Sequence, residues 1–201
     1  MVARFLLYVG FLATIALVMA QSPQDCTVPP PPVSPKLCCP FMDQGPVYNE
    51  SIYFDCWDQY AEFPLVPIAG GGIAGGPAGC AAECFFSKLG LLMHNQHYTL
   101  VDFYALDSHV KDFVDGERYE FIRQAMRYCV NESNVRAPIF VEIQRRPAVI
   151  DGLDNCNPIA GFAMSCMHFY AIRNCPDWTP DATEGCDELL DFYNQCPFNP
   201  Y

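Results

Sequence analysis

Twelve cysteines constrain this chain more than any other feature of its sequence. They are Cys26, Cys38, Cys39, Cys56, Cys80, Cys84, Cys129, Cys156, Cys166, Cys175, Cys186 and Cys196. An even number of cysteines in an oxidising compartment predicts a disulfide framework, here with up to six bridges. No C-x-x-C pair occurs, so the spacing does not favour a zinc site, and we expect no metal and no other cofactor.

The first twenty residues have the features of a secretory signal peptide. Arg4 precedes an apolar run, and small residues stand near a cleavage site that we place after Ala20. A membrane anchor is the alternative, but the run is short for a span, and Gly10 and Thr14 interrupt it. We therefore expect a mature chain that is secreted and does not insert into a membrane.

The overall composition favours a folded, acidic domain. Hydrophobic residues make up 51% of the chain and charged residues 17%, which is too apolar for a disordered protein. The formal net charge of −12 repels phosphate backbones and anionic lipids, so we expect neither nucleic acid nor a membrane as a partner.

Residues 70–75 contain glycines with the G-x-G-x-x-G spacing of dinucleotide-binding loops. Such a loop follows a buried strand, but Pro64 and Pro67 make the preceding segment unsuitable for a central strand. No alternation of strands and helices is evident elsewhere. We interpret residues 61–79 as a flexible connection into a cysteine-bearing helix.

Apolar spacing predicts an all-α fold: a compact, disulfide-crosslinked domain of about six to eight helices around an apolar cavity. Residues 135–150 could contain a short strand, but Pro138 and Pro147 bracket it, so we expect a loop with an extended middle. The expected helices cover 48–60, 80–93, 99–106, 108–114, 117–129, 157–173 and 179–196. The expected organisation is a signal peptide (1–20), a proline-rich arm (21–47), a helical core (48–175) and a C-terminal helical extension (176–201).

Two pairs of closely spaced cysteines restrict the pattern of bridges. Cys80 and Cys84 are four residues apart on an expected helix, so both point the same way, and each should bond a different neighbouring element. Cys38 and Cys39 are adjacent, and a bond between neighbours is strained, so they too should reach separate partners.

At these cysteines the sequence resembles the insect odorant-binding proteins. Three residues separate Cys80 from Cys84, and eight separate Cys166 from Cys175, as in that family's six-cysteine pattern. The six further cysteines, together with Pro176 directly after Cys175, resemble the Plus-C subclass.

The resemblance implies three bridges, Cys56–Cys84, Cys80–Cys166 and Cys129–Cys175. Three cysteines then remain in the arm and three toward the C-terminus. Because three is odd, complete pairing within the chain requires at least one bridge from the arm to the C-terminal half. The cysteines left for these extra bridges are Cys26, Cys38, Cys39, Cys156, Cys186 and Cys196.

The resemblance also implies a non-enzymatic carrier of small hydrophobic ligands, such as odorants or other semiochemicals, that acts in sensillar lymph and delivers them to chemosensory receptors. The alternative is an extracellular disulfide-rich interaction protein, such as an inhibitor or a structural secretion, with a filled core. Whether two chains associate stays open.

Apolar helix faces supply the expected ligand-binding residues. The alternative for each of them is ordinary core packing, but crosslinks can hold helices around space that packing alone would close. Methionines suit a pocket that adapts to several ligand shapes. The expected ligand-binding residues are Phe85, Leu89, Leu92, Phe121, Ile122, Met126, Phe162, Met167, Phe169 and Tyr170.

Motifs for catalysis are missing from the sequence, which contains neither G-x-S-x-G nor H-E-x-x-H. His94 and His97 lie three residues apart; ordinary surface histidines are favoured over a metal pair, and a pH-sensitive contact is the other alternative. Asn49 and Asn131 begin glycosylation sequons whose use stays open.

Overall fold

The computed structural model describes residues 26, 29–43, 47–63, 76–146, 152–153 and 155–196. The expected signal peptide and the glycines at 70–75 lie outside the described residues. The elements in chain order are α2 (Pro35–Cys38), the 3-10 helix η1 (Pro40–Asp43), α3 (Glu50–Asp58), α4 (Gly76–Lys88), β1 (Leu92–His94), β2 (Thr99–Val101), α5 (Phe103–Lys111), α6 (Gly116–Val135), α7 (Ala137–Gln144), α8 (Ile159–Arg173), the 3-10 helix η2 (Pro180–Ala182) and α9 (Cys186–Gln195).

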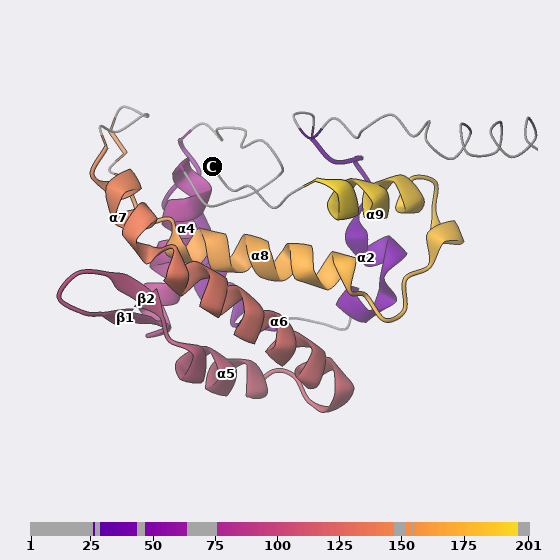
Figure 1. Ribbon diagram of the computed structural model, residues 1–201, viewed down its shortest axis with the longest axis horizontal. Coiled ribbons are helices and arrows are strands. Elements are labelled where there is room, and N and C mark those ends of the chain that lie inside the picture. Colours follow the sequence, from indigo (N-terminus) through magenta and orange to yellow (C-terminus); the bar gives the residue numbers. More distant parts are fainter. Residues whose placement is uncertain are drawn as a thin grey trace, which may run out of the picture.

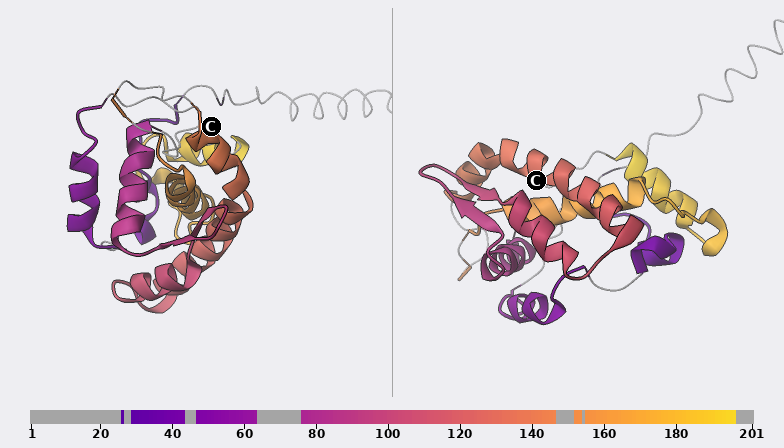
Figure 2. Two further views of the ribbon diagram at one scale, coloured as in Figure 1. Left: turned by 90° about the vertical axis from the view of Figure 1, so that its left-hand side faces the viewer. Right: turned by 90° about the horizontal axis from the view of Figure 1, so that it is seen from below.

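The all-α prediction is confirmed: the described part holds eight α-helices and one two-stranded antiparallel hairpin. Helix α8 runs through the middle of the molecule, with α4 and α6 packed against it (Figure 1). Helix α3 covers the far side of α4, and α5 packs on α6 (Figure 2). The hairpin lies at one end of the molecule and α2 and α9 at the other.

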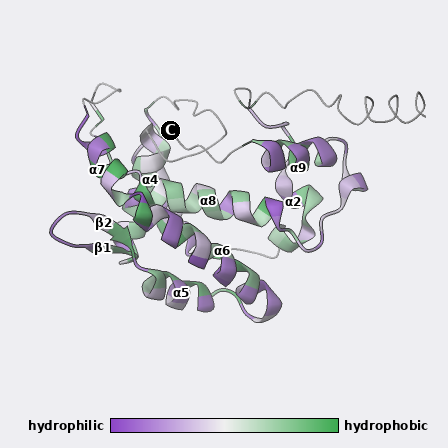
Figure 3. Ribbon diagram, in the orientation of Figure 1, coloured by the Kyte–Doolittle hydropathy of each residue, from purple (hydrophilic) through white to green (hydrophobic). Residues whose placement is uncertain are grey.

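The central position of α8 follows from its sequence. Side chains on most of its first half are buried, including Ile159 and Phe162, and the small residues Ala160 and Ala163 allow neighbouring helices to approach closely. The helix is pale to green over most of its length when coloured by hydropathy, whereas α5 and α6 show purple outer faces (Figure 3). An element without a continuous polar face has to be surrounded by others.

Buried side chains form two clusters. The main core joins α3, α4, α5, α6, α7 and the first half of α8. The tail core joins the arm, the end of α8 and α9, and consists of the buried residues Cys38, Phe169, Ile172, Cys186, Leu189, Phe192, Tyr193 and Cys196.

All twelve cysteines are disulfide-bonded. The predicted bridge Cys56–Cys84 is confirmed. The prediction that the arm is bonded to the C-terminal part is also confirmed, with three such bridges rather than the minimum of one. The other bridges are Cys26–Cys196, Cys38–Cys186, Cys39–Cys175, Cys80–Cys156 and Cys129–Cys166.

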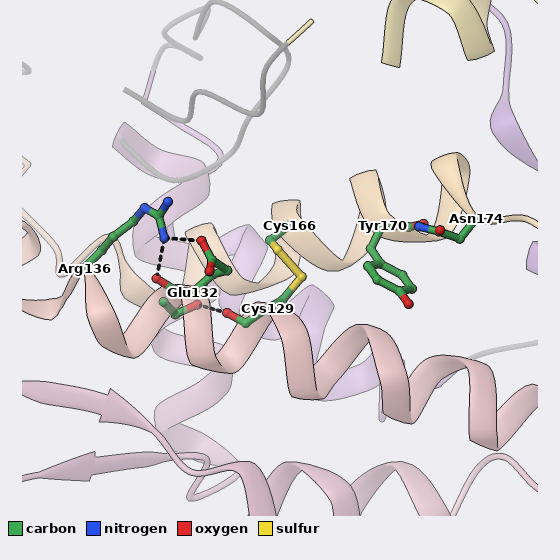
Figure 4. The surroundings of a disulfide bond; sticks show 7 residues. Cys129, Glu132, Arg136, Cys166, Tyr170 and Asn174 are labelled. Carbon is green, nitrogen blue, oxygen red and sulfur yellow. Dashed lines mark hydrogen bonds and ion pairs between the residues drawn. A yellow bond between two sulfur atoms is a disulfide. The ribbon is translucent and has the colours of Figure 1, made fainter. Parts of the chain in front are cut away.

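The predicted bridges Cys80–Cys166 and Cys129–Cys175 are wrong, and the packing of α6 along α8 explains why. Cys129 on α6 faces Cys166 on α8 with their Cα atoms 5.6 Å apart, within the range that a disulfide requires (Figure 4). Cys80 instead bonds Cys156, which immediately precedes α8. Cys175, past the end of α8, is left to the arm.

The helix predicted over residues 80–93 is displaced. Helix α4 begins at Gly76 and ends at Lys88, the chain turns at Gly90, where φ is +67°, and the last apolar residues form β1. Residues 92–94 pair with 99–101, so the helix predicted from residue 99 is wrong in its first part. A short apolar run fits a strand as well as a helix, and only the pairing decides.

Asp102 caps α5. Its carboxylate accepts hydrogen bonds from the backbone N–H groups of Tyr104 and Ala105, at 2.8 and 3.1 Å. The two short helices predicted over 99–106 and 108–114 are therefore one helix, because the cap satisfies the first free N–H groups and no second start is needed.

The predicted loop over 135–150 contains α7. Pro138 stands in the first turn of this helix, where the backbone N–H that proline lacks would have no partner within the helix. Phe140 packs in the main core and anchors the helix there.

The helix predicted over 179–196 is divided into η2 and α9 at Gly185, whose φ is +93°. A Cβ atom there would lie 2.7 Å from the Val33 side chain, so the arm packs where only glycine fits.

Candidate functional site

A cavity of about 440 Å³ lies between the arm and helices α3, α4, α5, α6 and α8. Its volume falls within the range of roughly 300–1,000 Å³ that small-molecule pockets occupy. Most of the lining is aromatic, aliphatic or methionine. The lining residues are Lys36, Phe41, Met42, Val47, Tyr48, Glu50, Phe85, Phe86, Leu91, Leu106, His109, Val110, Arg118, Phe121, Ile122, Ala125, Met126, Met164, Met167, His168 and Ala171.

Aromatic contacts fix two walls of the cavity. Phe85 on α4 packs edge-on against Tyr48, with the ring centroids 5.3 Å apart. Phe121 on α6 packs edge-on against Phe41 of η1 at 5.1 Å and lies 6.1 Å from Tyr170 on α8. Rings locked by such pairs have little freedom to turn inward and fill the cavity.

Disulfides hold the cavity-bearing elements together. The Cys56–Cys84 bridge joins α3 to α4, and the Cys129–Cys166 bridge joins α6 to α8. The Cys39–Cys175 bridge fastens the arm at the end of α8, directly before Phe41 and Met42 enter the lining. The arm is thus part of the site rather than a strap outside it.

Buried Asp107 positions α5 on α6 beside the cavity. Its carboxylate accepts hydrogen bonds from the Tyr119 hydroxyl at 2.7 Å and from Arg123 Nε at 3.2 Å, and lies 3.4 Å from Lys111 Nζ. Burial by itself would raise the pKa of this carboxyl, but these hydrogen bonds and the positive charges of Lys111 and Arg123 together lower it. Asp107 therefore stays ionised and keeps both helices in place.

Two histidines of the lining, His109 and His168, have lowered pKa values. Desolvation lowers the pKa of His109, against a smaller opposing effect of Asp112. Desolvation also lowers the pKa of His168, although part of its side chain remains exposed. Both imidazoles are therefore neutral at physiological pH.

Five of the ten expected ligand-binding residues line the cavity, namely Phe85, Phe121, Ile122, Met126 and Met167. They come from α4, α6 and α8, which the disulfides draw together. Their contact with a ligand stays a prediction.

The other five expected residues lie outside the lining. Leu89 and Leu92 pack at the edge of the main core. Phe162 packs on the ring of Phe140, and Phe169 belongs to the tail core. Tyr170 stands behind Phe121. Apolar periodicity identifies the buried side of a helix but cannot separate the residues that meet a cavity from those that meet another side chain.

Sequence reasoning missed the lining residues that come from the arm and the polar ones. Lys36, Phe41 and Met42 belong to a proline-rich segment without periodicity, and only the cysteines of the arm indicated that it is fastened. For the polar lining residues, the sequence offered one signal: a polar residue between apolar ones on a helix. His168, between Met167 and Phe169, is an example.

Neither His94 nor His97 lies in the cavity. His94 shares a hydrogen bond with Thr99 across the exposed hairpin, at 3.1 Å between Nδ1 and Oγ1. Within the ranges that the structure describes, no group of three His, Cys, Asp or Glu side chains is arranged to hold a metal ion. No helix in these same ranges combines the length and the apolar character that crossing a membrane requires.

Comparison with known proteins agrees with this architecture. A family model described as AgamOBP47-like matches residues 46–192. Over 200 residues the chain is 24% identical to odorant-binding protein 47 of Anopheles gambiae, with 96% of this chain and 82% of that protein covered. With its six disulfides and its helical domain around an apolar cavity, the chain is an insect odorant-binding protein of the Plus-C type. Within that class the chain belongs to the AgamOBP47-like family, since the family model covers well over half of it.

Proposed function

We propose that this protein is a secreted carrier that takes small hydrophobic molecules, odorants or other semiochemicals, into its cavity and transports them through sensillar lymph to chemosensory receptors. The observation that carries the proposal is the cavity of about 440 Å³ with its largely apolar lining. The name of the Anopheles relative supports an odorant as the ligand. Six disulfides support an oxidising extracellular compartment.

The size of the hydrophobic effect is sufficient for reversible capture. A ligand that buries roughly 300 Å² of apolar surface gains about 7.5 kcal/mol at 25 cal/mol per Å². The cost of association reduces this gain, so micromolar affinity, about −8 kcal/mol, requires close packing or a polar contact in addition. Weak and reversible binding of this kind suits a carrier that has to release its ligand.

The cavity argues against the alternative of a secreted interaction protein with a filled core. A stable globule without a ligand would pack its interior to about the density of an organic crystal, and a void of this size forfeits that packing. Four methionines in the lining, Met42, Met126, Met164 and Met167, give the walls the adaptability that varied ligands require.

Displacement of an environment-sensitive fluorophore tests the proposal. N-phenylnaphthylamine should show saturable binding to the disulfide-bonded protein, and a ten-carbon semiochemical should displace it. Ala171→Phe places a ring in the cavity and should abolish uptake, because Ala171 is a half-buried lining residue.

Ala105→Phe is the matched control. Ala105 is also half-buried and packs on the main core, but it is not among the lining residues. Saturable binding that Ala171→Phe removes and Ala105→Phe retains supports the carrier function. A folded protein that takes up no probe, or an Ala171→Phe variant that binds normally, contradicts it.

A further inference from the structure

One wall of the cavity lining is hydrocarbon, and the polar residues of the lining come from other elements. Phe85 and Phe86 of α4, with Leu91 just after it, contribute only hydrocarbon surface. Lys36 comes from α2, His109 from the last turn of α5, and Arg118 from the first turn of α6. Helices α5 and α6 contribute apolar residues as well, and His168 of α8 stands among apolar lining residues, so the contrast is between the hydrocarbon wall at α4 and the rest of the described lining.

The elements that carry the polar residues meet at one end of the molecule. Phe41 of η1, which directly follows α2, packs on Phe121 near the start of α6 with ring centroids 5.1 Å apart. The end of α5 leads into the start of α6 through a short turn, and the two helices pack together. Figure 1 places α2 and the start of α6 toward the right of the molecule and α4 toward the left. The cavity thus has a hydrocarbon wall at α4, and we call the end at α2 and the α5–α6 turn, which carries Lys36, His109 and Arg118, the polar end.

The described lining holds more cations than carboxylates, in a chain whose net charge is −12. Lys36 and Arg118 are the two cations of the lining, and Glu50, the first residue of α3, is the one carboxylate among the lining residues that the structure describes. Burial removes part of the hydration of the Arg118 guanidinium and so lowers its pKa. The guanidinium nevertheless stays ionised. Cations beside an apolar cavity attract an anion more strongly than they would in water.

His109 adds a hydrogen-bonding group at the same end. Its Nε2 atom is buried and has no hydrogen-bond partner among the described residues, and its ring packs 5.1 Å from that of Phe113. A buried polar atom without a partner is uncommon and costs about 1–3 kcal/mol, so such an atom in a pocket is an indication that a ligand or water supplies the partner.

We propose that the ligand of this cavity is an amphiphile with a carboxylate head. The carboxylate lies at the polar end against Arg118 and Lys36, with His109 donating a hydrogen bond to one of its oxygens, and the hydrocarbon chain extends toward Phe85 and Phe86. Arginine suits this role because its planar guanidinium can bind both oxygens of a carboxylate at once. This inference rests on the proposed carrier function and specifies its ligand class.

A series of ligands that differ only in the head group tests the inference. Decanoic acid, decanol and methyl decanoate share the same acyl or alkyl chain, and each is titrated against N-phenylnaphthylamine bound to the full disulfide-bonded protein at about pH 7.5, where the acid is ionised. We expect the acid to bind about tenfold more tightly than the alcohol or the ester, the size of one charge-assisted contact.

Charge-removing variants locate the head group. Arg118→Met should lower the affinity for decanoic acid about tenfold and leave that for decanol unchanged, because only the acid uses the charge. Lys36→Met, at an exposed position, should give a smaller change in the same direction. Arg145→Met is the matched control, since Arg145 is exposed directly after α7, outside the lining, and paired with Glu142.

The outcomes separate this inference from the carrier function. If the three ligands bind equally, or if Arg118→Met weakens all three alike, the carboxylate assignment is overturned while the carrier function stands. If neither the fluorophore nor any ligand binds the folded protein, both fail. A ¹³C-carboxyl label on decanoic acid gives an independent readout: its chemical shift in the complex should move on Arg118→Met and stay unchanged on Arg145→Met.

Discussion

In the main core, buried side chains from six helices surround one another, and the three bridges join residues 28, 76 and 37 positions apart. The tail core holds eight buried residues, three of which are cysteines, and its bridges join segments 136 to 170 positions apart. So small a cluster buries too little apolar surface to offset the entropy of ordering an arm and a C-terminal extension. The comparison shows that hydrophobic burial maintains one region and covalent crosslinks the other.

The two regions meet at the cavity. Lys36, Phe41 and Met42 reach the lining only because the arm is fastened to the end of α8 and to α9. Thr179, which precedes η2, reinforces this connection by donating hydrogen bonds to the Cys38 carbonyl from its backbone N–H and its hydroxyl, at 2.8 and 3.0 Å. Disulfides far from α4 therefore shape the ligand site that α4 helps to build.

Truncating one phenylalanine in each core should give the largest effects and the clearest contrast. Phe162→Ala opens a hole in the main core and should cost about 3–5 kcal/mol of unfolding free energy. Phe192→Ala removes an equally buried ring from the tail core, but bridges retain α9, so we expect a smaller loss, restricted to α9. Chemical denaturation and hydrogen exchange with intact disulfides measure both. Equal losses of global stability would show that the tail core depends on burial as much as the main core does.

Removing single arm bridges should have the next largest effect. Cys39→Ser with Cys175→Ser should cost about 2–4 kcal/mol, increase hydrogen exchange in η1 and weaken probe binding, because Phe41 and Met42 follow this bridge directly.

The matched control for this change is Cys26→Ser with Cys196→Ser. That bridge also spans most of the chain, but neither cysteine adjoins a lining residue, so probe affinity should be unchanged although stability falls. If both double variants bind the probe like the unaltered protein, the arm does not shape the cavity.

Acid should produce the smallest effect, and it should begin at His109 in the cavity lining. The folded-state pKa of His109 lies below its ordinary value of 6.5, so between that lowered pKa and 6.5 the unfolded chain binds more protons than the folded one. The free energy of unfolding should therefore fall as pH drops through 6.5 and level off below the folded-state pKa. His109→Phe should reduce this slope in denaturation curves recorded above about pH 5.

Asp107 acts at lower pH and does not interfere. Its lowered pKa means that its contribution is fully present above 3.8 and is lost only as pH falls through the folded-state value. Glu83 has a raised pKa, caused first by burial, and therefore acts in the opposite direction near its own titration. Comparing His109→Phe with the unaltered chain cancels both contributions. An unchanged slope would mean that His109 is as well hydrated in the folded state as in the unfolded one.

Local sequence patterns were sufficient wherever helix geometry alone decides the outcome. The four-residue spacing of Cys80 and Cys84 predicts separate partners, and these are Cys156 and Cys56. The parity of the cysteines predicts an arm bonded to the C-terminal half, a conclusion that holds even though two of the bridges assumed for it are wrong. Prolines misled the prediction at α7, because a proline in the first turn of a helix starts it rather than preventing it.

The amino-acid sequence by itself determined that this protein is helical, that its cysteines pair within one acidic domain, and that its arm is bonded to the C-terminal extension. Only the tertiary structure decided that Cys166 bonds Cys129, that residues 92–101 form a hairpin, and that five of the ten expected residues meet a cavity. The physical reason is distance. Helical periodicity fixes which side of an element is apolar, whereas the partner that this side meets, and any space left between them, depends on how elements distant in the chain pack together.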